Sequence, residues 1–210
     1  MKRIDFHKQF RPYQLFHTRS IFLLDSWFST NQLTRWKKKW LLNKLQNWWW
    51  IFADVQMNEK VRLMIAWKIY QPSYISLEKG LSYYNLIPES VFSVTSVSTR
   101  RTQQYQISEL GFTYQKIPPS LFRWYKKIER WWAEILIGEV EKVLLDYFYL
   151  HADQRSFDDI VWLRINPFSY TEQVNEEKLL RYANLYPQTV QKTIALLHAY
   201  CLDYVHDAAD

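Results

Sequence analysis

Glycine is almost missing from this chain of 210 residues, which contains only three glycines. Ordinary usage of roughly 7% would supply about fifteen. A glycine-rich phosphate-binding loop is therefore excluded, because such a loop needs several glycines close together. Tight turns, which usually place glycine in the left-handed backbone region, must be made here by other residue types.

Cysteine and long apolar runs are also scarce. The single cysteine, Cys201, excludes an intramolecular disulfide and gives no sign of an oxidising compartment. Together with His198 it supplies two metal ligands, whereas a structural zinc site needs four, so we expect no metal and no cofactor. The first residues lack the apolar run of a signal peptide, and the longest uncharged apolar run, Trp48–Ala53, is too short to cross a bilayer. We therefore expect a cytoplasmic protein without membrane contact.

Acidic residues are few in the first third of the chain. Residues 1–72 contain 13 lysines and arginines against four acids, whereas residues 73–210 contain 14 against 17. Residues 26–53 contain five basic residues and no acid. A basic head before an acidic remainder is expected when one end of a protein meets a polyanion such as DNA, although isolated charge runs are often only solvated surface.

This basic segment contains a helical repeat followed by a hairpin pattern. The apolar residues of the repeat fall on one helical face and are Leu33, Trp36, Trp40 and Leu41. Thr18 predicts the cap of an earlier helix ending at Asp25, with Ile21, Leu24 and Phe28 turned inward. Strand-like runs at 42–45 and 48–52 flank a turn at Gln46-Asn47. This order of helix, basic helix and hairpin is typical of a winged helix-turn-helix, whose second helix lies in the DNA major groove.

In that arrangement the polar side chains of the basic helix and hairpin contact DNA. Arginine and lysine bind phosphates or guanine edges, and asparagine and glutamine can read adenine. The predicted DNA-binding residues are Asn31, Gln32, Thr34, Arg35, Lys37, Lys38, Lys39, Lys44 and Asn47. From these residues alone, a solvated amphipathic helix beside a hairpin is the alternative interpretation.

The remainder of the chain predicts a sheet followed by helices. Runs rich in β-branched or alternating residues predict strands at 91–97, 103–107, 110–117, 121–128 and 134–137. Apolar periodicity predicts helices at 58–70, 74–85, 139–150, 158–164 and 175–185, and a last helix from Pro187. The apolar stripe of that last helix consists of Val190, Ile194, Leu197, Cys201 and Tyr204, and it is predicted to be buried in the core, with a dimer seam as the alternative. The fold class is therefore α+β, a winged helix-turn-helix followed by a mixed β-sheet and α-helical domain.

Four sequence blocks carry a resemblance to a known family. They are Pro72–Glu89, Val94–Arg101, Gly111–Tyr114 and Glu141–Leu150, in that order. The chain resembles the AbiEi-type antitoxins of bacterial type IV toxin–antitoxin (abortive infection) systems. The resemblance implies a winged-helix domain over 1–72 with a linking helix, and an antitoxin domain over 73–210.

The resemblance also implies a function that involves no enzyme activity. Such a protein counteracts a nucleotidyltransferase-like toxin, without a stable complex, and represses its own operon by binding inverted repeats in double-stranded DNA. On the antitoxin-domain motif lie Arg100, Arg101, Glu141, Lys142 and Asp146. For Lys142, Asp146 and Glu139 the residues alone favour a surface ion pair.

Two other functions stay open at this point. One is a winged-helix transcriptional regulator whose second domain senses a ligand or partner. The other is a nucleic-acid-processing enzyme, although Glu141 lies directly beside Lys142 and so lacks the intervening residue of the restriction-type nuclease pattern. A second basic group could extend a DNA footprint, meet another acidic partner, or be solvated strand ends; it comprises Arg100, Arg101, Lys116, Arg123, Lys126, Lys127 and Arg130.

Tryptophan, with eleven copies, departs from the family pattern where glycine is scarce. The pattern leads us to expect glycine at Trp40, Trp48 and Trp124, asparagine at Trp67 and a polar residue at Trp162. Tryptophan is a poor helix cap and a poor second residue of a tight hairpin turn, since both favour positive φ. Either this chain is altered from a natural one, or its turns have shifted to longer forms.

Overall fold

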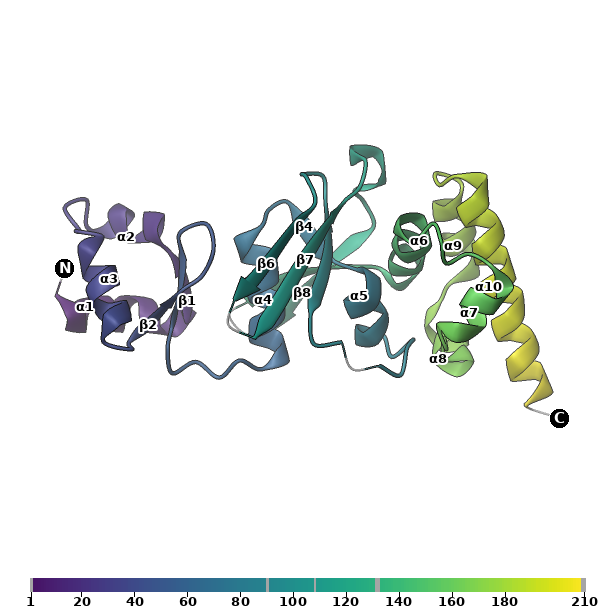
Figure 1. Ribbon diagram of the computed structural model, residues 1–210, viewed down its shortest axis with the longest axis horizontal. Coiled ribbons are helices and arrows are strands. Elements are labelled where there is room, and N and C mark those ends of the chain that lie inside the picture. The colour runs from purple at the N-terminus through teal and green to yellow at the C-terminus, as the bar shows by residue number, and fades with distance from the viewer. Residues whose placement is uncertain (1, 90, 108, 131–132, 209–210) are drawn as a thin grey trace. The chain divides into compact units, whose positions relative to one another are not determined.

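The computed structural model describes residues 2–89, 91–107, 109–130 and 133–208 (Figure 1). Of the second basic group, the side chain of Arg130 lies outside this description. The chain divides into two compact units: Met1–Gln71 with residues 129–133, and Pro72–Ile128 with Glu134–Asp210. Each unit has its own core. In the described residues no helix is both long and apolar enough to pass through a bilayer.

The first unit consists of short helices around a small sheet. Its elements are α1 (Arg3–Phe10), the 3-10 turn η1 (Arg11–Tyr13), β1 (Leu15–His17), α2 (Thr18–Leu24), α3 (Asn31–Lys38), β2 (Leu42–Lys44), β3 (Trp49–Phe52) and α4 (Glu59–Ile69). The strands pair antiparallel in the order β1-β3-β2. The basic helix therefore leads directly into a β-hairpin, as the sequence pattern predicts.

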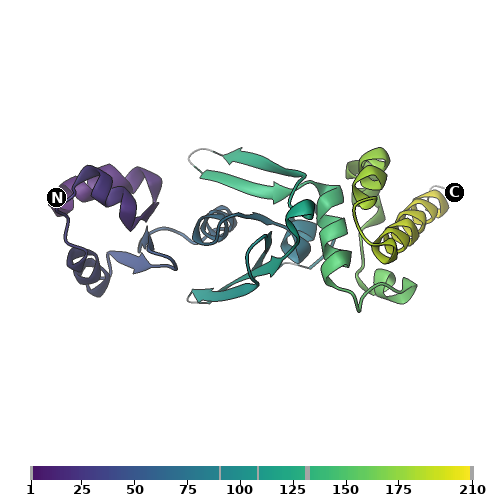
Figure 2. The same ribbon diagram turned by 90° about the horizontal axis from the view of Figure 1, so that it is seen from above.

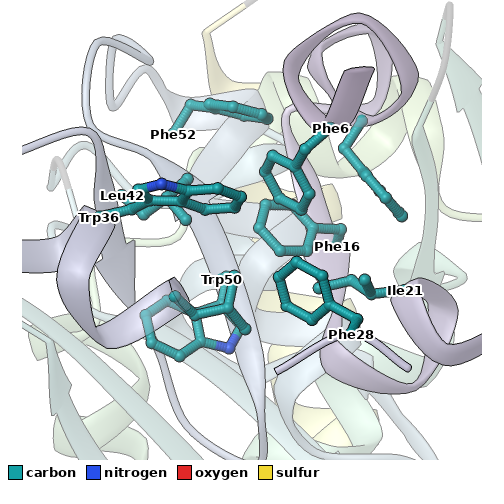
Figure 3. Packing of buried hydrophobic residues seen from close by; sticks show 10 residues of the cluster. Phe6, Phe16, Ile21, Phe28, Trp36, Leu42, Trp50 and Phe52 are labelled. Carbon is teal, nitrogen blue, oxygen red and sulfur yellow. The ribbon is translucent and has the colours of Figure 1, made fainter. Parts of the chain in front are cut away.

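Aromatic side chains fill the core of this unit (Figure 3). Phe6 lies at its centre, with ring centroids 4.6 Å from Trp36 and 5.2 Å from Phe16. Phe28 and Phe52 complete its surroundings at 6.2 and 6.1 Å. Tilted and edge-on aromatic pairs contribute about 0.5–1.5 kcal/mol each beyond simple burial, so a unit of this size gains much of its stability from rings.

Two predictions about α2 are wrong. His17, not Thr18, caps the helix, and its ring nitrogen accepts from the Arg19 amide at 3.0 Å. The Thr18 hydroxyl instead donates to the Trp48 carbonyl and accepts from the Trp50 indole, both at 3.0 Å. Leu24, expected inward, is exposed, because the helix ends there and the chain turns away; Ile21 and Phe28 are buried as expected.

The second unit is a mixed sheet with a group of helices. The elements are β4 (Ser73–Ile75), α5 (Leu77–Tyr83), β5 (Val94–Ser98), β6 (Gln103–Ile107), β7 (Leu110–Lys116), η2 (Pro119–Leu121), β8 (Tyr125–Arg130), β9 (Ala133–Gly138), α6 (Val140–Leu150), α7 (Phe157–Trp162), α8 (Pro167–Gln173), α9 (Glu176–Ala183) and α10 (Gln188–Asp207). The strand order is β6-β7-β5-β4-β9-β8, with β5–β7 and β4–β9 parallel. The α+β class and the mixed sheet are confirmed.

Several boundaries in this unit differ from prediction. Residues 73–75 form a strand, because they pair with β5, and the helix begins only at Leu77. The strand expected from Leu121 begins only at Tyr125, because Leu121 ends a 3-10 turn and Trp124 has a left-handed backbone. Helix α8 was not predicted. Tyr204 is exposed, although the other residues of the predicted α10 stripe are buried.

Helix α6 lies between the sheet and helices α7 to α10, with α10 furthest from the sheet (Figures 1 and 2). Two glycines allow α6 to pack closely against α5 and the end of β9. A Cβ on Gly80 of α5 would lie 2.7 Å from a methyl group of Val143, and one on Gly138 would lie 3.1 Å from another. Two of the three glycines are therefore explained by contact with a single α6 side chain.

Candidate nucleic-acid interface and buried polar cluster

Helix α3 presents the predicted DNA-binding residues on its open face. Leu33 and Trp36 anchor the helix in the aromatic core. The exposed residues on and just after the helix are Asn31, Thr34, Arg35, Lys37, Lys38 and Lys39, while Gln32 is half-buried. Every charge on this surface is positive. One prediction is wrong: Trp40 was placed on the apolar face but is 84% exposed, because the helix ends at Lys38.

The β2–β3 hairpin carries one further cation. The exposed Lys44 ammonium lies 5.1 Å from the Trp48 ring centroid and 5.9 Å from that of Trp50. Asn47, also exposed, donates its side-chain amide to the Ile69 carbonyl at 2.6 Å. Asn47 therefore ties the hairpin to the end of α4, and its contact with DNA stays a prediction.

The hairpin turn is tight and lacks glycine. The Trp49 amide donates to the Gln46 carbonyl at 3.1 Å, so Asn47 and Trp48 are its central pair. Their φ angles are 51° and 66°. Positive φ at both central residues is the mark of a type I′ turn, which ordinarily uses Asn-Gly. The Leu45 amide donates to the Trp49 carbonyl at 2.8 Å, so three residues, Gln46 to Trp48, separate the paired strands, one more than predicted.

All three tryptophans at positions expected to be glycine have left-handed backbones. Trp40, Trp48 and Trp124 have φ of 56°, 66° and 57°, while no glycine in the described residues has positive φ. A non-glycine residue in this region costs of order 1–3 kcal/mol unless surrounding structure compensates. Trp124 has such compensation, because its ring stacks on Tyr182 with centroids 3.8 Å apart and planes 8° from parallel.

A buried polar cluster lies in the second unit around helix α6. Lys142 and Asp146 are wholly inaccessible and form an ion pair one helical turn apart. The Tyr74 and Ser76 hydroxyls each donate to the other Asp146 oxygen at 2.9 Å. Tyr186 donates to Asp146 at 3.0 Å and accepts from Lys142 at 2.5 Å. The expectation of a surface ion pair is therefore wrong.

Burial dominates the protonation equilibria of this cluster. It lowers the pKa of Lys142, while the charge of Asp146 and its hydrogen bond act in the opposite direction. Burial and the same carboxylate raise the pKa of Tyr74 and of Tyr186, so both hydroxyls remain donors. The carboxylate is satisfied by four donors, which is the condition for keeping a charge in a protein interior.

The two glutamates next to the cluster, Glu139 and Glu141, do not pair with Lys142. Glu139, expected to do so, instead accepts from Lys178 Nζ and the Tyr182 hydroxyl, both at 3.0 Å. Burial opposes ionisation of Glu139, but these two bonds hold its pKa below the ordinary value. Glu141 is buried and accepts from the Asn175 amide at 2.9 Å, which fixes the start of α9.

The five antitoxin-motif residues thus separate into two sets. Glu141, Lys142 and Asp146 are buried and positioned by hydrogen bonds. Arg100 and Arg101 are exposed directly after β5, and the Arg100 amide is held by the Ser98 hydroxyl at 3.1 Å. The hydrogen-bond partners of the buried set were not predicted. Tyr74 and Ser76 could have been suspected from their place in the first block, whereas nothing in the sequence marked Tyr186.

No protein-family model matches the chain. A search of curated proteins also found no match. Over the described residues, no group of three or more histidine, cysteine or acidic side chains is placed to hold a metal ion.

Proposed function

We propose that this chain is a cytoplasmic, DNA-binding antitoxin that counteracts a nucleotidyltransferase-like toxin and represses its own operon. The first unit acts as a winged helix that inserts α3 in the major groove and lays the β2–β3 hairpin along the flanking backbone. The remainder supplies the antitoxin activity. Neither task requires chemistry by this chain.

The observation that carries the DNA-binding proposal is the charge and exposure of α3. Arg35, Lys37 and Lys38 are all exposed, and the opposite face of the same helix is fixed in the aromatic core. Lysine and arginine that neutralise phosphates release counterions, which gives affinity, while arginine and asparagine can add base readout. A rigid helix with such a face meets the geometric need of a recognition element.

The antitoxin part of the proposal rests on the four sequence blocks. In the structure these blocks occupy β4, β5, β7 and α6, and the β4 strand is hydrogen-bonded to β5 and β9. Tyr74 and Ser76 from the first block bond Asp146 from the last. Blocks distant in sequence therefore meet in one core.

The experiment measures binding to DNA from the region upstream of the chain's own gene, over a range of salt concentrations. The double variant Arg35→Ala/Lys38→Ala is expected to bind at least tenfold more weakly, and its log K against log salt slope to fall by about two units, since each lost phosphate contact removes about 0.9. Lys44→Ala is expected to lower the slope by about one.

A matched double variant, Lys60→Ala/Lys192→Ala, removes two exposed charges elsewhere and should leave binding unchanged. If it weakens binding as much as the α3 variant, the interface is not α3. Growth rescue on co-expression with a neighbouring nucleotidyltransferase toxin tests the second task. DNA binding without rescue would instead support a regulator whose second domain senses a ligand or partner, and cleavage of DNA or RNA would refute both.

A further inference from the structure

The first unit contains a cavity of about 680 Å³, lined only by residues of that unit. Its inner wall is formed by the buried side chains of Phe6, Trp36, Leu42 and Phe52 (Figure 3). A volume of 300–1,000 Å³ with mostly apolar walls is typical of a site for a small molecule. The aromatic rings favour a flat, unsaturated ligand, because stacked or edge-on ring contacts add to burial.

Charge at the same cavity is mainly positive. Arg3 and Lys8 both line it from α1 and are exposed, and in the described part of the chain neither forms an ion pair. The lining acid, Asp54, has its charge matched by Arg11, whose guanidinium donates to it at 2.8 Å. The cavity therefore combines aromatic walls with two uncompensated cations.

We propose that this cavity binds a small aromatic carboxylate. The ring system would lie against Trp36 and Phe52, and the carboxylate would face Arg3 and Lys8. Arginine binds carboxylate through paired N–H donors, and hydrogen bonds between charged groups are the stronger kind. This inference does not depend on the proposed DNA binding, because it concerns the α1 side of α3 and not its open face.

Calorimetric titration of the full chain with three matched probes tests the proposal. The probes are 2-naphthoate, 2-naphthylmethanol and 2-naphthylmethylammonium, which share a ring system and differ in charge. We expect the carboxylate to bind at least tenfold more tightly than the alcohol, and the amine to bind most weakly. Equal affinity for the three probes, or binding of none, would overturn the proposal.

Variants locate the site and its charge selectivity. Arg3→Ala/Lys8→Ala is expected to reduce naphthoate affinity about tenfold and to leave the alcohol unchanged, since both side chains are exposed and the aromatic wall is intact. Arg19→Ala/Lys60→Ala removes the same charge away from the cavity and should retain the full preference. Circular dichroism confirms that each variant folds. The proposal is contradicted if the preference for the carboxylate survives in Arg3→Ala/Lys8→Ala. It is also contradicted if the chain self-associates in a way that closes the cavity.

Discussion

Lys142 and Asp146, one turn apart on α6, place opposite charges against each other without any exposure to solvent. Asp146 has more hydrogen-bond partners than Lys142, because three hydroxyls and the Lys142 ammonium all donate to it. Removing an acceptor of that kind leaves several buried donors unsatisfied, whereas removing the lysine leaves the three hydroxyls bonded.

We expect Asp146→Ala to lower the free energy of unfolding by about 3–5 kcal/mol, and Lys142→Met by about 2–3 kcal/mol. Denaturant unfolding followed by circular dichroism measures both. Lys178→Met, which breaks the partly exposed bond to Glu139, is the control and should cost at most about 1 kcal/mol. A larger loss of unfolding free energy for Lys142→Met than for Asp146→Ala would contradict the idea that the aspartate contributes more to stability than the lysine.

The left-handed tryptophans predict a gain in stability on replacement by glycine. Trp48→Gly relieves the backbone strain at φ 66° and removes a side chain that is 59% exposed. It should therefore raise the free energy of unfolding by about 1 kcal/mol. Trp124→Gly should gain less, because it loses the stack on Tyr182. Thermal and denaturant unfolding measure the effect.

The control for this series is Trp162→Gly. Trp162 is 82% exposed but lies in α7 with a right-handed backbone, so glycine there should bring no gain and a loss of up to about 1 kcal/mol. A gain at all of these positions alike would show that removal of exposed tryptophan, and not relief of backbone strain, is responsible.

His151 and Glu78 predict a dependence of stability on pH. His151 Nδ1 donates to the Tyr147 carbonyl at 2.9 Å, and its Nε2 lies 3.2 Å from Glu78. The bond with Glu78 raises the pKa of His151; burial of Glu78 acts against its ionisation, but its bond with His151 brings the pKa of Glu78 below the ordinary value. In the folded state both groups are therefore charged at pH values between their ordinary pKa values of 4.5 and 6.5.

The histidine contributes stability below its ordinary pKa of 6.5, and this contribution is lost as pH rises through the higher pKa of the folded state. We expect the chain to be more stable at about pH 5.5 than at about pH 8.5 by roughly 0.5–1 kcal/mol, relative to His151→Gln, since partial exposure screens the pair. NMR titration of the His151 ring checks the pKa directly. A ring that titrates below 6.5 would refute the assignment.

Gly80 predicts a stability loss with a specific remedy. The new methyl group of Gly80→Ala would meet Val143 methyl groups at 2.7 and 2.9 Å, so we expect a loss of about 1–3 kcal/mol. Val143→Ala removes those methyl groups, and the double variant should lose at least about 1 kcal/mol less than the sum of the single losses. Ser82→Ala on the same helix is the control. Additive losses would show that the contact is not limiting.

Local sequence patterns predicted part of this structure and missed part of it for physical reasons. The basic helix, the hairpin and α6 were predicted from the spacing of apolar residues along the chain. The residues at those positions, such as Leu33 and Trp36, are buried in the structure. The sequence predicts helix from residue 74, because Tyr74 and Ile75 precede the helical repeat of Leu77 and Leu81, but pairing with β5 outweighs that weak preference.

The candidate site shows the same limit. The exposed cations of α3 were predicted because charge and helical spacing are local properties. The cluster around Asp146 depends on Tyr186, which lies 40 residues away and meets it only through the packing of the helices after α6. Burial of Lys142 could not be read from the sequence, since an i,i+4 pair looks the same on a surface helix.

The turn at Gln46–Trp49 has a consequence for the order in which the first unit folds. An unfolded chain rarely visits left-handed φ at asparagine and tryptophan in succession, so this turn does not nucleate its own hairpin as Asn-Gly would. Contacts from further away hold it: Thr18 binds the Trp48 carbonyl from α2, and the Asn47 amide binds Ile69 at the end of α4. The hairpin is thus expected to close late, after α2 and the end of α4 have formed, and its tip should exchange amide protons only when these contacts to Thr18 and Ile69 open.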